Sequence, residues 1–173
     1  MPEEPGRFGA TVVIDRPIDE VFAFLADGEN DKRFSSRIIE IKKTTDGPPG
    51  AGSIYASTAK DGPLKAKHEF ELIAFEPPTR IRWKELSKTT PVVVPEGGYD
   101  LEPAGDGTRL TFLNVLEGRG LLGKLIAPMA LRSARKGAEA FFAHIGGFVF
   151  GLATVFLVAK QRPTAPSARF PVY

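Results

Sequence analysis

The sequence predicts an α+β fold in which a curved antiparallel sheet of about seven strands wraps around a long C-terminal helix. Hydrophobic residues follow a period of two through most of residues 37–117, with Gly and Pro turns between the runs. A short run with helical spacing precedes this region and a long one follows it. At 173 residues the chain suits one domain, because a core of that size buries most of its apolar surface.

The first two elements are a strand and a short helix. Residues 8–14 are rich in β-branched side chains, as strands are, and Asp15-Arg16-Pro17 ends the run. We expect Asp15 to cap a helix and Pro17 to lie in its first turn. That helix, reaching about residue 26, is predicted by apolar residues at helical spacing, namely Ile18, Val21, Phe22 and Leu25.

Six further strands are predicted between turn residues, and with the first strand they give the expected seven. They cover residues 38–43, 52–59, 64–75, 80–86, 97–102 and 108–117. The turns between them are short and rich in Gly and Pro, which favours sequential antiparallel hairpins. Alternation within the strands predicts an inner face made of Ala66, His68, Phe70, Leu72, Ala74, Ile81, Trp83, Glu85, Tyr99, Leu101, Leu110, Phe112, Asn114 and Leu116.

A long helix is expected after Gly118-Arg119-Gly120, with Pro128 kinking or restarting it. Its predicted inner stripe consists of Leu122, Ile126, Met129, Ser133, Gly137, Ala140 and His144. The stripe is thin at Ser133, Gly137 and Ala140, so either the helix approaches the sheet closely or a void remains between them. The prediction of an internal ligand cavity depends on the second alternative.

Two stretches resemble a known family. Residues 13–27 (VIDRPIDEVFAFLAD) resemble the opening of the polyketide cyclase/dehydrase and lipid-transport group of the START-like (SRPBCC) superfamily, and residues 107–112 (GTRLTF) resemble its last strand. The resemblance covers about residues 8–147 and implies the helix-grip fold. This chain has Phe34 where the family usually has Trp. Members hold lipids, sterols, polyketides or plant hormones in a cavity, and only some are enzymes, so the resemblance implies a fold and not a reaction.

The expected organisation is a flexible N-terminus at residues 1–7, a helix-grip ligand-binding domain at 8–147, and an apolar, then Pro-rich tail at 148–173. Residues 140–159 carry no formal charge over 20 positions, a length that could span a bilayer. Gly146-Gly147 favours the alternative that the helix ends there. Residues 148–159 are then too short to cross, and suit packing, self-association or a weak membrane contact.

Three polar side chains on the predicted inner face are candidates for catalysis, namely His68, Glu85 and Tyr99. A neutral His68 could orient a ligand carbonyl or act as a base, and the alternative is a hydrogen-bonded core histidine. A buried Glu85 would have to pair or be protonated, unless a bulge turns it to solvent. Asn114 could add an amide to the same cavity.

The full set of residues predicted to line the ligand cavity comes from the strands and the long helix. It comprises Ala66, His68, Phe70, Trp83, Glu85, Tyr99, Leu101, Leu110, Phe112, Asn114, Met129, Ser133 and Gly137. The aromatic residues and Met129 could equally form ordinary core.

Several classes of site are not expected from this sequence. The chain has no cysteine, and its two histidines lie in different elements, so no thiolate chemistry, metal site or cofactor is expected. P-loop, Rossmann and GxSxG motifs do not occur. The net charge of +2 is scattered among acids, which argues against nucleic acid as a partner. The N-terminus does not resemble a secretory signal, so a cytoplasmic location is expected, with membrane association through the tail as an option.

Three functions remain open from the sequence. The leading hypothesis is a binding or carrier protein for a small hydrophobic ligand, lipid or polyketide-like, with specificity from a few inward polar groups. The second is a cofactor-free cyclase or dehydratase in which His68, helped by Tyr99 or Glu85, moves protons in the same cavity. The third is a membrane-associated or oligomeric interaction protein that acts through its C-terminal tail.

Overall fold

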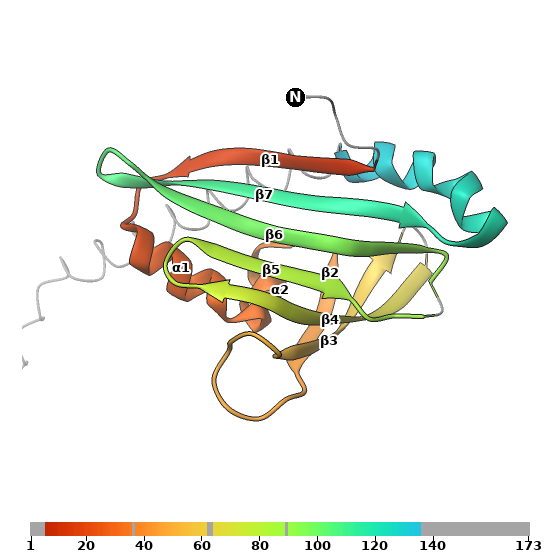
Figure 1. The fold of residues 1–173 in the computed structure, drawn as a ribbon, viewed down its shortest axis with the longest axis horizontal. Coiled ribbons are helices and arrows are strands. Elements are labelled where there is room, and N and C mark those ends of the chain that lie inside the picture. Colours follow the sequence, from red (N-terminus) through yellow and green to blue (C-terminus); the bar gives the residue numbers. More distant parts are fainter. Residues whose placement is uncertain (1–5, 36, 62–63, 89, 136–173) are drawn as a thin grey trace, which may run out of the picture.

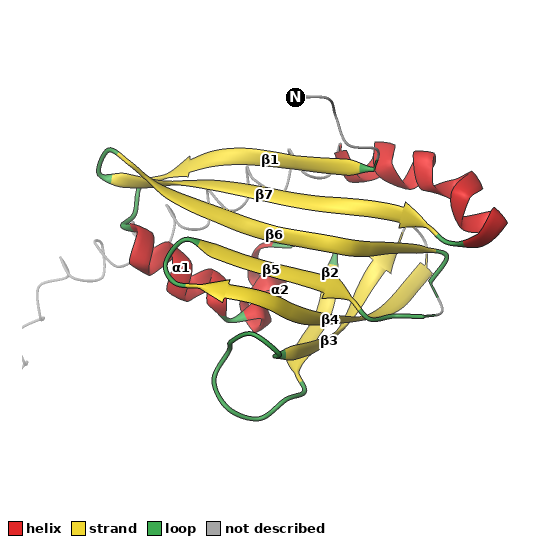
Figure 2. Ribbon diagram, in the orientation of Figure 1, coloured by secondary structure: helices red, strands yellow, loops and turns green. Residues whose placement is uncertain are grey.

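The computed structural model describes residues 6–35, 37–61, 64–88 and 90–135. Figure 2 shows the strands gathered in one curved sheet, with helices and loops between them. The elements in chain order are β1 (Arg7–Ile14), α1 (Ile18–Ala26), the 3-10 turn η1 (Gly28–Asn30), α2 (Asp31–Phe34), β2 (Ile38–Lys43), β3 (Ile54–Asp61), β4 (Leu64–Glu76), β5 (Arg80–Glu85), β6 (Val92–Ala104) and β7 (Gly107–Gly118). Residues 120–135 are helical and run through Pro128 without interruption.

The seven strands form one antiparallel sheet in the order β1-β7-β6-β5-β4-β3-β2 (Figure 1). Strands β2 to β7 follow one another as hairpins, while β1 joins the sheet at the far side of β7. The α+β helix-grip fold predicted from the sequence is confirmed. Strand β1 begins at Arg7, which pairs with Val115, so this residue belongs to the sheet and not to a free N-terminus.

The strand boundaries agree closely with the predicted ones except in β6. This strand starts at Val92, five residues before the predicted start at Gly97. The sequence Val94-Pro95-Glu96 argued against a strand here, because Pro has no backbone N–H to donate to the hydrogen bonds between strands. The structure accommodates Pro95 in a register shift between Val93 and Glu96.

The connection between β1 and α1 is held against the start of β7. The Thr108 hydroxyl, at the start of β7, donates a 2.7 Å hydrogen bond to the Arg16 carbonyl, and Ile14 pairs with Thr108 in the ladder. Helix α1 then begins with the amides of Glu20 and Val21 donating to the Pro17 carbonyl. Pro17 is therefore the residue that precedes the helix, and the predicted side-chain cap by Asp15 is wrong.

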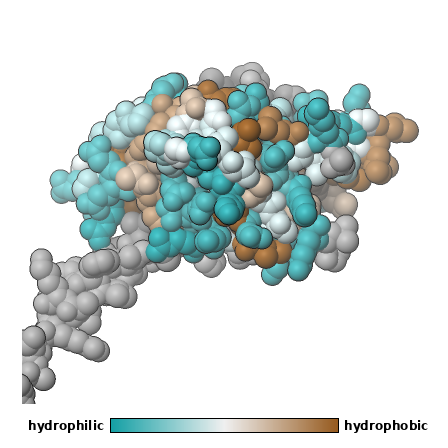
Figure 3. All heavy atoms as spheres, turned by 90° about the horizontal axis from the view of Figure 1, so that it is seen from below, coloured by the Kyte–Doolittle hydropathy of each residue, from teal (hydrophilic) through white to brown (hydrophobic). Residues whose placement is uncertain are grey.

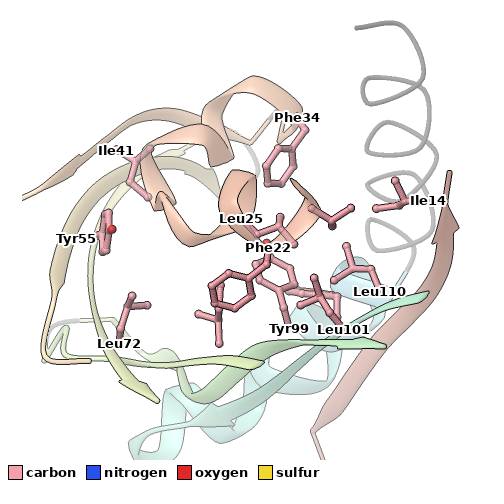
Figure 4. Close-up of a cluster of buried hydrophobic side chains, with 13 residues drawn as sticks. Ile14, Phe22, Leu25, Phe34, Ile41, Tyr55, Leu72, Tyr99, Leu101 and Leu110 are labelled. Atoms are coloured by element: carbon pink, nitrogen blue, oxygen red, sulfur yellow. The ribbon is translucent and has the colours of Figure 1, made fainter. Parts of the chain in front are cut away.

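Helices α1 and α2 lie on the concave side of the sheet. The buried side chains of α1 are Val21, Phe22 and Leu25, and each contributes about 1.5–3 kcal/mol by leaving water. Phe22 meets Phe75 of β4 edge-to-face at 5.3 Å, and Phe34 of α2 is buried beside Phe24. Figure 4 shows Phe22 and Leu25 pointing to the same centre as Tyr55 and Leu72 from the curved strands.

A β-bulge changes which residues of β4 face inward. The register between β4 and β5 shifts between Leu72 and Ala74, and Ile73 at the shift is 44% exposed. The extra residue reverses the alternation, so Phe75 packs on the core. The prediction that Ala74 continues the inner face is wrong for this reason.

The helical residues 120–135 present a different face to the protein from the predicted one. Gly123 and Ala134 are buried, whereas Met129 is 72% exposed and Ser133 is also exposed. Leu122, another member of the predicted inner stripe, is 63% exposed. The predicted stripe is therefore wrong at Leu122, Met129 and Ser133, and these three side chains lie at the surface. Gly137, Ala140 and His144 lie outside the described residues, as do the residues of the predicted tail.

Candidate functional site

Three aromatic side chains from neighbouring strands meet on the inner face of the sheet. Trp83 of β5 lies edge-to-face with Tyr99 of β6 at 5.0 Å and stacks near Phe112 of β7 at 6.3 Å. Phe8 of β1 continues the group, with its ring 6.0 Å from Phe112. The antiparallel register produces this contact, because Tyr99 pairs directly with Phe112 and Ile81, two residues before Trp83, pairs with Tyr99.

The absence of a side chain at Gly97 lets the polar side chain of Asn114 lie beside these aromatic residues. A Cβ at this position would lie 1.9 Å from the Asn114 side-chain oxygen and 2.3 Å from Trp83 Nε1. Both polar atoms therefore lie directly over the glycine, in space that any other residue would occupy. The Asn114 oxygen is buried and accepts no hydrogen bond from the described residues. A buried acceptor of this kind is costly unless a further group satisfies it.

His68 of β4 and Glu85 of β5 form a pair. His68 Nδ1 lies 2.8 Å from Glu85 Oε1, and their side chains are 13% and 2% exposed. The β4–β5 register places Glu85 opposite Phe70, so His68 reaches it diagonally on the same face. The sequence singled out both residues but not their contact, which joins positions 17 residues apart.

The backbone of β6 holds Glu85 from the other side. Glu85 Oε2 accepts a 2.9 Å hydrogen bond from the Val94 amide, and Thr90 lies 3.4 Å from Oε1. Burial raises the pKa of this carboxyl, but the hydrogen bonds from His68 and Val94 and the charge of His68 outweigh it and leave the pKa lowered. Glu85 is therefore ionised at neutral pH, and its Oε1 can accept a proton from His68 Nδ1. The alternative that a bulge turns Glu85 to solvent is wrong.

A second group of polar side chains consists of Asp31 of α2, Tyr55 of β3 and Tyr99 of β6. Tyr55 of β3 and Tyr99 of β6 are 3% and 4% exposed, and burial raises the pKa of both hydroxyls. The nearby Gly28 amide opposes the rise at Tyr55 without reaching hydrogen-bond geometry, and the Tyr55 hydroxyl has no partner in the described part of the chain. The negative charge of Asp31 contributes to the raised pKa at both tyrosines, so its carboxyl lies within electrostatic reach of each.

Asp31 itself is unlike an ordinary surface carboxyl. Burial, and secondly the charge of Asp27, raises its pKa from 3.8 to about 7. The protonated form can then donate a hydrogen bond near neutral pH, which an ionised carboxylate cannot. Sequence reasoning missed Asp31 and Tyr55, because residues 27–31 read as a helix break and β3 carries small polar residues on both faces.

The remaining predicted site residues occupy different depths. Leu101 and Leu110 are 4% and 0% exposed and belong to the core under α1. Ala66 and Phe70 are half-buried on β4, and the Phe70 ring stacks near His68 at 5.9 Å. The structure thus gathers the strand residues on one concave face and leaves Met129 and Ser133 apart from it.

The described residues contain neither a cluster of metal ligands nor a membrane-spanning helix. In residues 6–135, apart from the short gaps, no three His, Asp or Glu side chains are placed to hold a metal ion. Among the helices that the structure describes, none is long and apolar enough to cross a membrane.

A family model described as polyketide cyclase / dehydrase and lipid transport matches residues 5–146. No curated protein sequence matches.

Solved structures with the same fold are numerous, and three illustrate their range. A protein of Thermus thermophilus, TTHA0849, is 18% identical with a TM-score of 0.67, over 84% of this chain and 98% of its own. The Zhui aromatase/cyclase of Streptomyces sp. R1128 is 15% identical with a TM-score of 0.64, over 91% and 98%. Ara h 8.0201 is 15% identical with a TM-score of 0.59, over 84% and 97%. At these identities the likeness shows the fold alone.

Proposed function

This chain belongs to the polyketide cyclase / dehydrase and lipid transport family, and from that premise we propose that it binds a small hydrophobic molecule on the concave face of its sheet. The proposal rests on two buried polar atoms, Tyr55 Oη of β3 and the Asn114 side-chain oxygen of β7. Neither has a hydrogen-bond partner among the described residues. They lie among apolar side chains, and a few polar groups in an apolar surrounding are typical of small-molecule sites.

The polar atoms define the chemistry that the ligand should carry. The Tyr55 hydroxyl can donate or accept, whereas the Asn114 oxygen only accepts, so a ligand with a hydroxyl or enol satisfies Asn114. Trp83, Tyr99 and Phe112 offer aromatic surface beside Asn114. A flat, oxygenated hydrocarbon therefore fits this face better than an unsubstituted acyl chain.

Trp83 makes binding directly measurable, because it is the single tryptophan of the chain and lies on the proposed binding face. We expect its emission to change on titration with hydroxylated polycyclic aromatics, and native mass spectrometry of freshly purified protein to show a bound small molecule. Replacing Asn114 with Leu should weaken the binding of hydroxylated ligands more than the binding of matched hydrocarbons. A flat Trp83 response across sterols, fatty acids and aromatic polyketides, with no mass adduct, would overturn the proposal.

A second candidate function, proton transfer by His68, is favoured by its contact with Glu85. A base held by a hydrogen-bonded carboxylate is the arrangement that general-base sites use. In a dehydration, His68 would take a proton from carbon next to a substrate carbonyl and return it to the departing hydroxyl, which leaves as water. Glu85 would stabilise the imidazolium formed between these steps.

Catalysis and simple binding are separated by changing His68 alone. In the catalytic case, His68→Gln abolishes turnover of a poly-β-keto substrate while the Trp83 binding signal remains. The double variant His68→Asn with Glu85→Gln, which keeps two hydrogen-bonding side chains but no base, should lose turnover in the same way. Equal slow turnover by wild type, variants and buffer would leave the protein a binder.

A further inference from the structure

The helical residues 120–135 carry four large apolar side chains on the outside. Leu121 is 89% exposed, Leu122 63%, Leu125 77% and Met129 72%. Leu121, Leu125 and Met129 follow one another at intervals of four and form one ridge along the helix. Figure 3 shows hydrophobic residues gathered at the end of the molecule where this helix begins. We refer to Leu121, Leu122, Leu125 and Met129 as the outer ridge.

The opposite face of the helix has small residues at its centre, with the half-buried Ile126 and Leu131 beside them. Gly123 and Ala134 are buried, and Ala127 and Ala130 are half-buried at the same helical spacing. A Cβ on Gly123 would lie 2.1 Å from the Pro91 carbonyl oxygen, so a larger residue cannot take that position. The Arg119 amide donates to the same carbonyl at 2.8 Å and fixes the start of the helix. Rotation of the helix to bury its leucines is therefore blocked by the backbone of residue 91.

Positive charge accompanies the outer ridge. Residues 118–135 contain Arg119, Lys124, Arg132 and Arg135 but no Asp or Glu. Lys124 and Arg132 are exposed on the same helix, and Arg132 shares the side of Leu121 and Leu125 by helical periodicity. Arg119 and Arg135 are engaged with the Ser87 and Arg7 carbonyls, which hold the two ends of the segment to the sheet. The nearest acid in the sequence is Glu117, at the end of β7.

We propose that the outer ridge docks on an anionic lipid surface, with Leu121, Leu122, Leu125 and Met129 entering the interface and Lys124 and Arg132 contacting the lipid headgroups. Exposed apolar side chains flanked by cations, with no acids between them, are what an interfacial helix requires. A protein partner of neutral or basic surface would gain nothing from Lys124 and Arg132. This inference stands independently of the ligand site, because no residue is shared between them.

The test is co-sedimentation of the full chain with vesicles of phosphatidylcholine alone and of phosphatidylcholine mixed with phosphatidylglycerol. We expect binding to the anionic vesicles only, falling as salt is added. Leu121→Ser with Leu125→Ser should lower the partition coefficient about tenfold or more, since two leucines leave the interface. Val13→Ser with Ile73→Ser is the matched control, because these are exposed apolar residues elsewhere on the sheet at 57% and 44%.

Charge is tested by Lys124→Glu, which should weaken binding about tenfold because it changes two charges at the lipid surface. Lys65→Glu, at an exposed position on β4, should leave binding unchanged. Binding that survives both Leu121→Ser with Leu125→Ser and Lys124→Glu would place the contact elsewhere, in the uncharged residues 140–159 for example, and would overturn the proposal. The proposal would also be overturned if the wild-type protein self-associated without binding vesicles and the variant Leu121→Ser with Leu125→Ser were monomeric.

Discussion

Asp31 carries a carboxyl group that folding moves from water to a less solvated position within electrostatic reach of Tyr55 and Tyr99. Its pKa rises from 3.8 to about 7, so ionisation opposes folding as the pH rises between these values. The sign follows from the raised value: the protonated form is favoured in the folded state, and stability is lost as the pH climbs through the folded-state pKa.

Asp31→Asn removes this ionisation and should stabilise the protein at pH 8 by on the order of 3 kcal/mol, with no gain at pH 3. Urea unfolding at several pH values measures the difference. Asp19→Asn, at an exposed position on α1, should change stability little at any of them. A constant difference between wild type and Asp31→Asn across the pH range would contradict the raised pKa.

Glu85 shows the opposite behaviour because its pKa is lowered below 4.5. Its stabilising contribution is present above that value and is lost as the pH falls through the lowered pKa. Glu85→Ala leaves His68 and the Val94 amide without their acceptor and should cost about 3 kcal/mol at neutral pH. The matched control is Glu71→Ala, whose 2.8 Å contact with Lys84 is partly exposed, so that the loss should cost less than about 1 kcal/mol.

The difference between the two glutamates is read from chemical denaturation at pH 7 and again below pH 4. The cost of Glu85→Ala should shrink in acid, whereas the cost of Glu71→Ala should remain small throughout. Equal costs at pH 7 would mean that burial adds nothing to the His68 contact.

At the scale of single elements, β6 depends on Gly97 to let Trp83 and Asn114 approach its backbone. Gly97→Ala places a methyl group where these two side chains lie and should cost about 1–3 kcal/mol. The change should also shift the emission of Trp83, which reports its displacement. Gly50→Ala, where no atom lies within 4 Å of the added Cβ, should leave both stability and emission unchanged.

The strands were largely predictable from the sequence, because alternation and turn residues act locally. The six residues of β2 match the predicted range, and Trp83, Tyr99 and Phe112 meet as their strand faces indicated. The bulge in β4 was not predictable, since nothing in Leu72-Ile73-Ala74-Phe75 distinguishes a continued alternation from a reversed one. A single inserted residue decides which side chain packs.

The inward face of the helix after β7 was harder to predict, because apolar residues occur around most of the helix circumference. Periodicity then fits more than one inner stripe, and the sequence alone favoured the one through Met129. Contact with the Pro91 carbonyl selects the stripe of Gly123 and Ala134 instead. The contact between His68 and Glu85 could not be predicted for a related reason. It depends on the register of β4 against β5, which the hydrophobic pattern of the sequence fixes only to within a residue.

For the molecule as a whole, the contact between Thr108 and Arg16 joins the first corner of the chain to its last strand. Thr108 is fully buried, so Thr108→Val leaves the Arg16 carbonyl without its donor and should cost about 1–3 kcal/mol. Thr108→Ser keeps the hydroxyl and should recover part of the loss. Thr111→Val removes an exposed hydroxyl contact to Thr11 and should cost under about 0.5 kcal/mol, as thermal unfolding would show.

The pairing of β1 with β7 also has a consequence for biosynthesis. Arg7 meets Val115 in the ladder, so the first strand leaves the ribosome long before its neighbour in the sheet exists. At typical elongation rates this delay lasts about 5–20 s, during which the edge-forming segment FGATVVI must wait without a partner. Nascent chains stalled before β7 should accordingly recruit chaperones at this segment, and release them once the final strand has emerged.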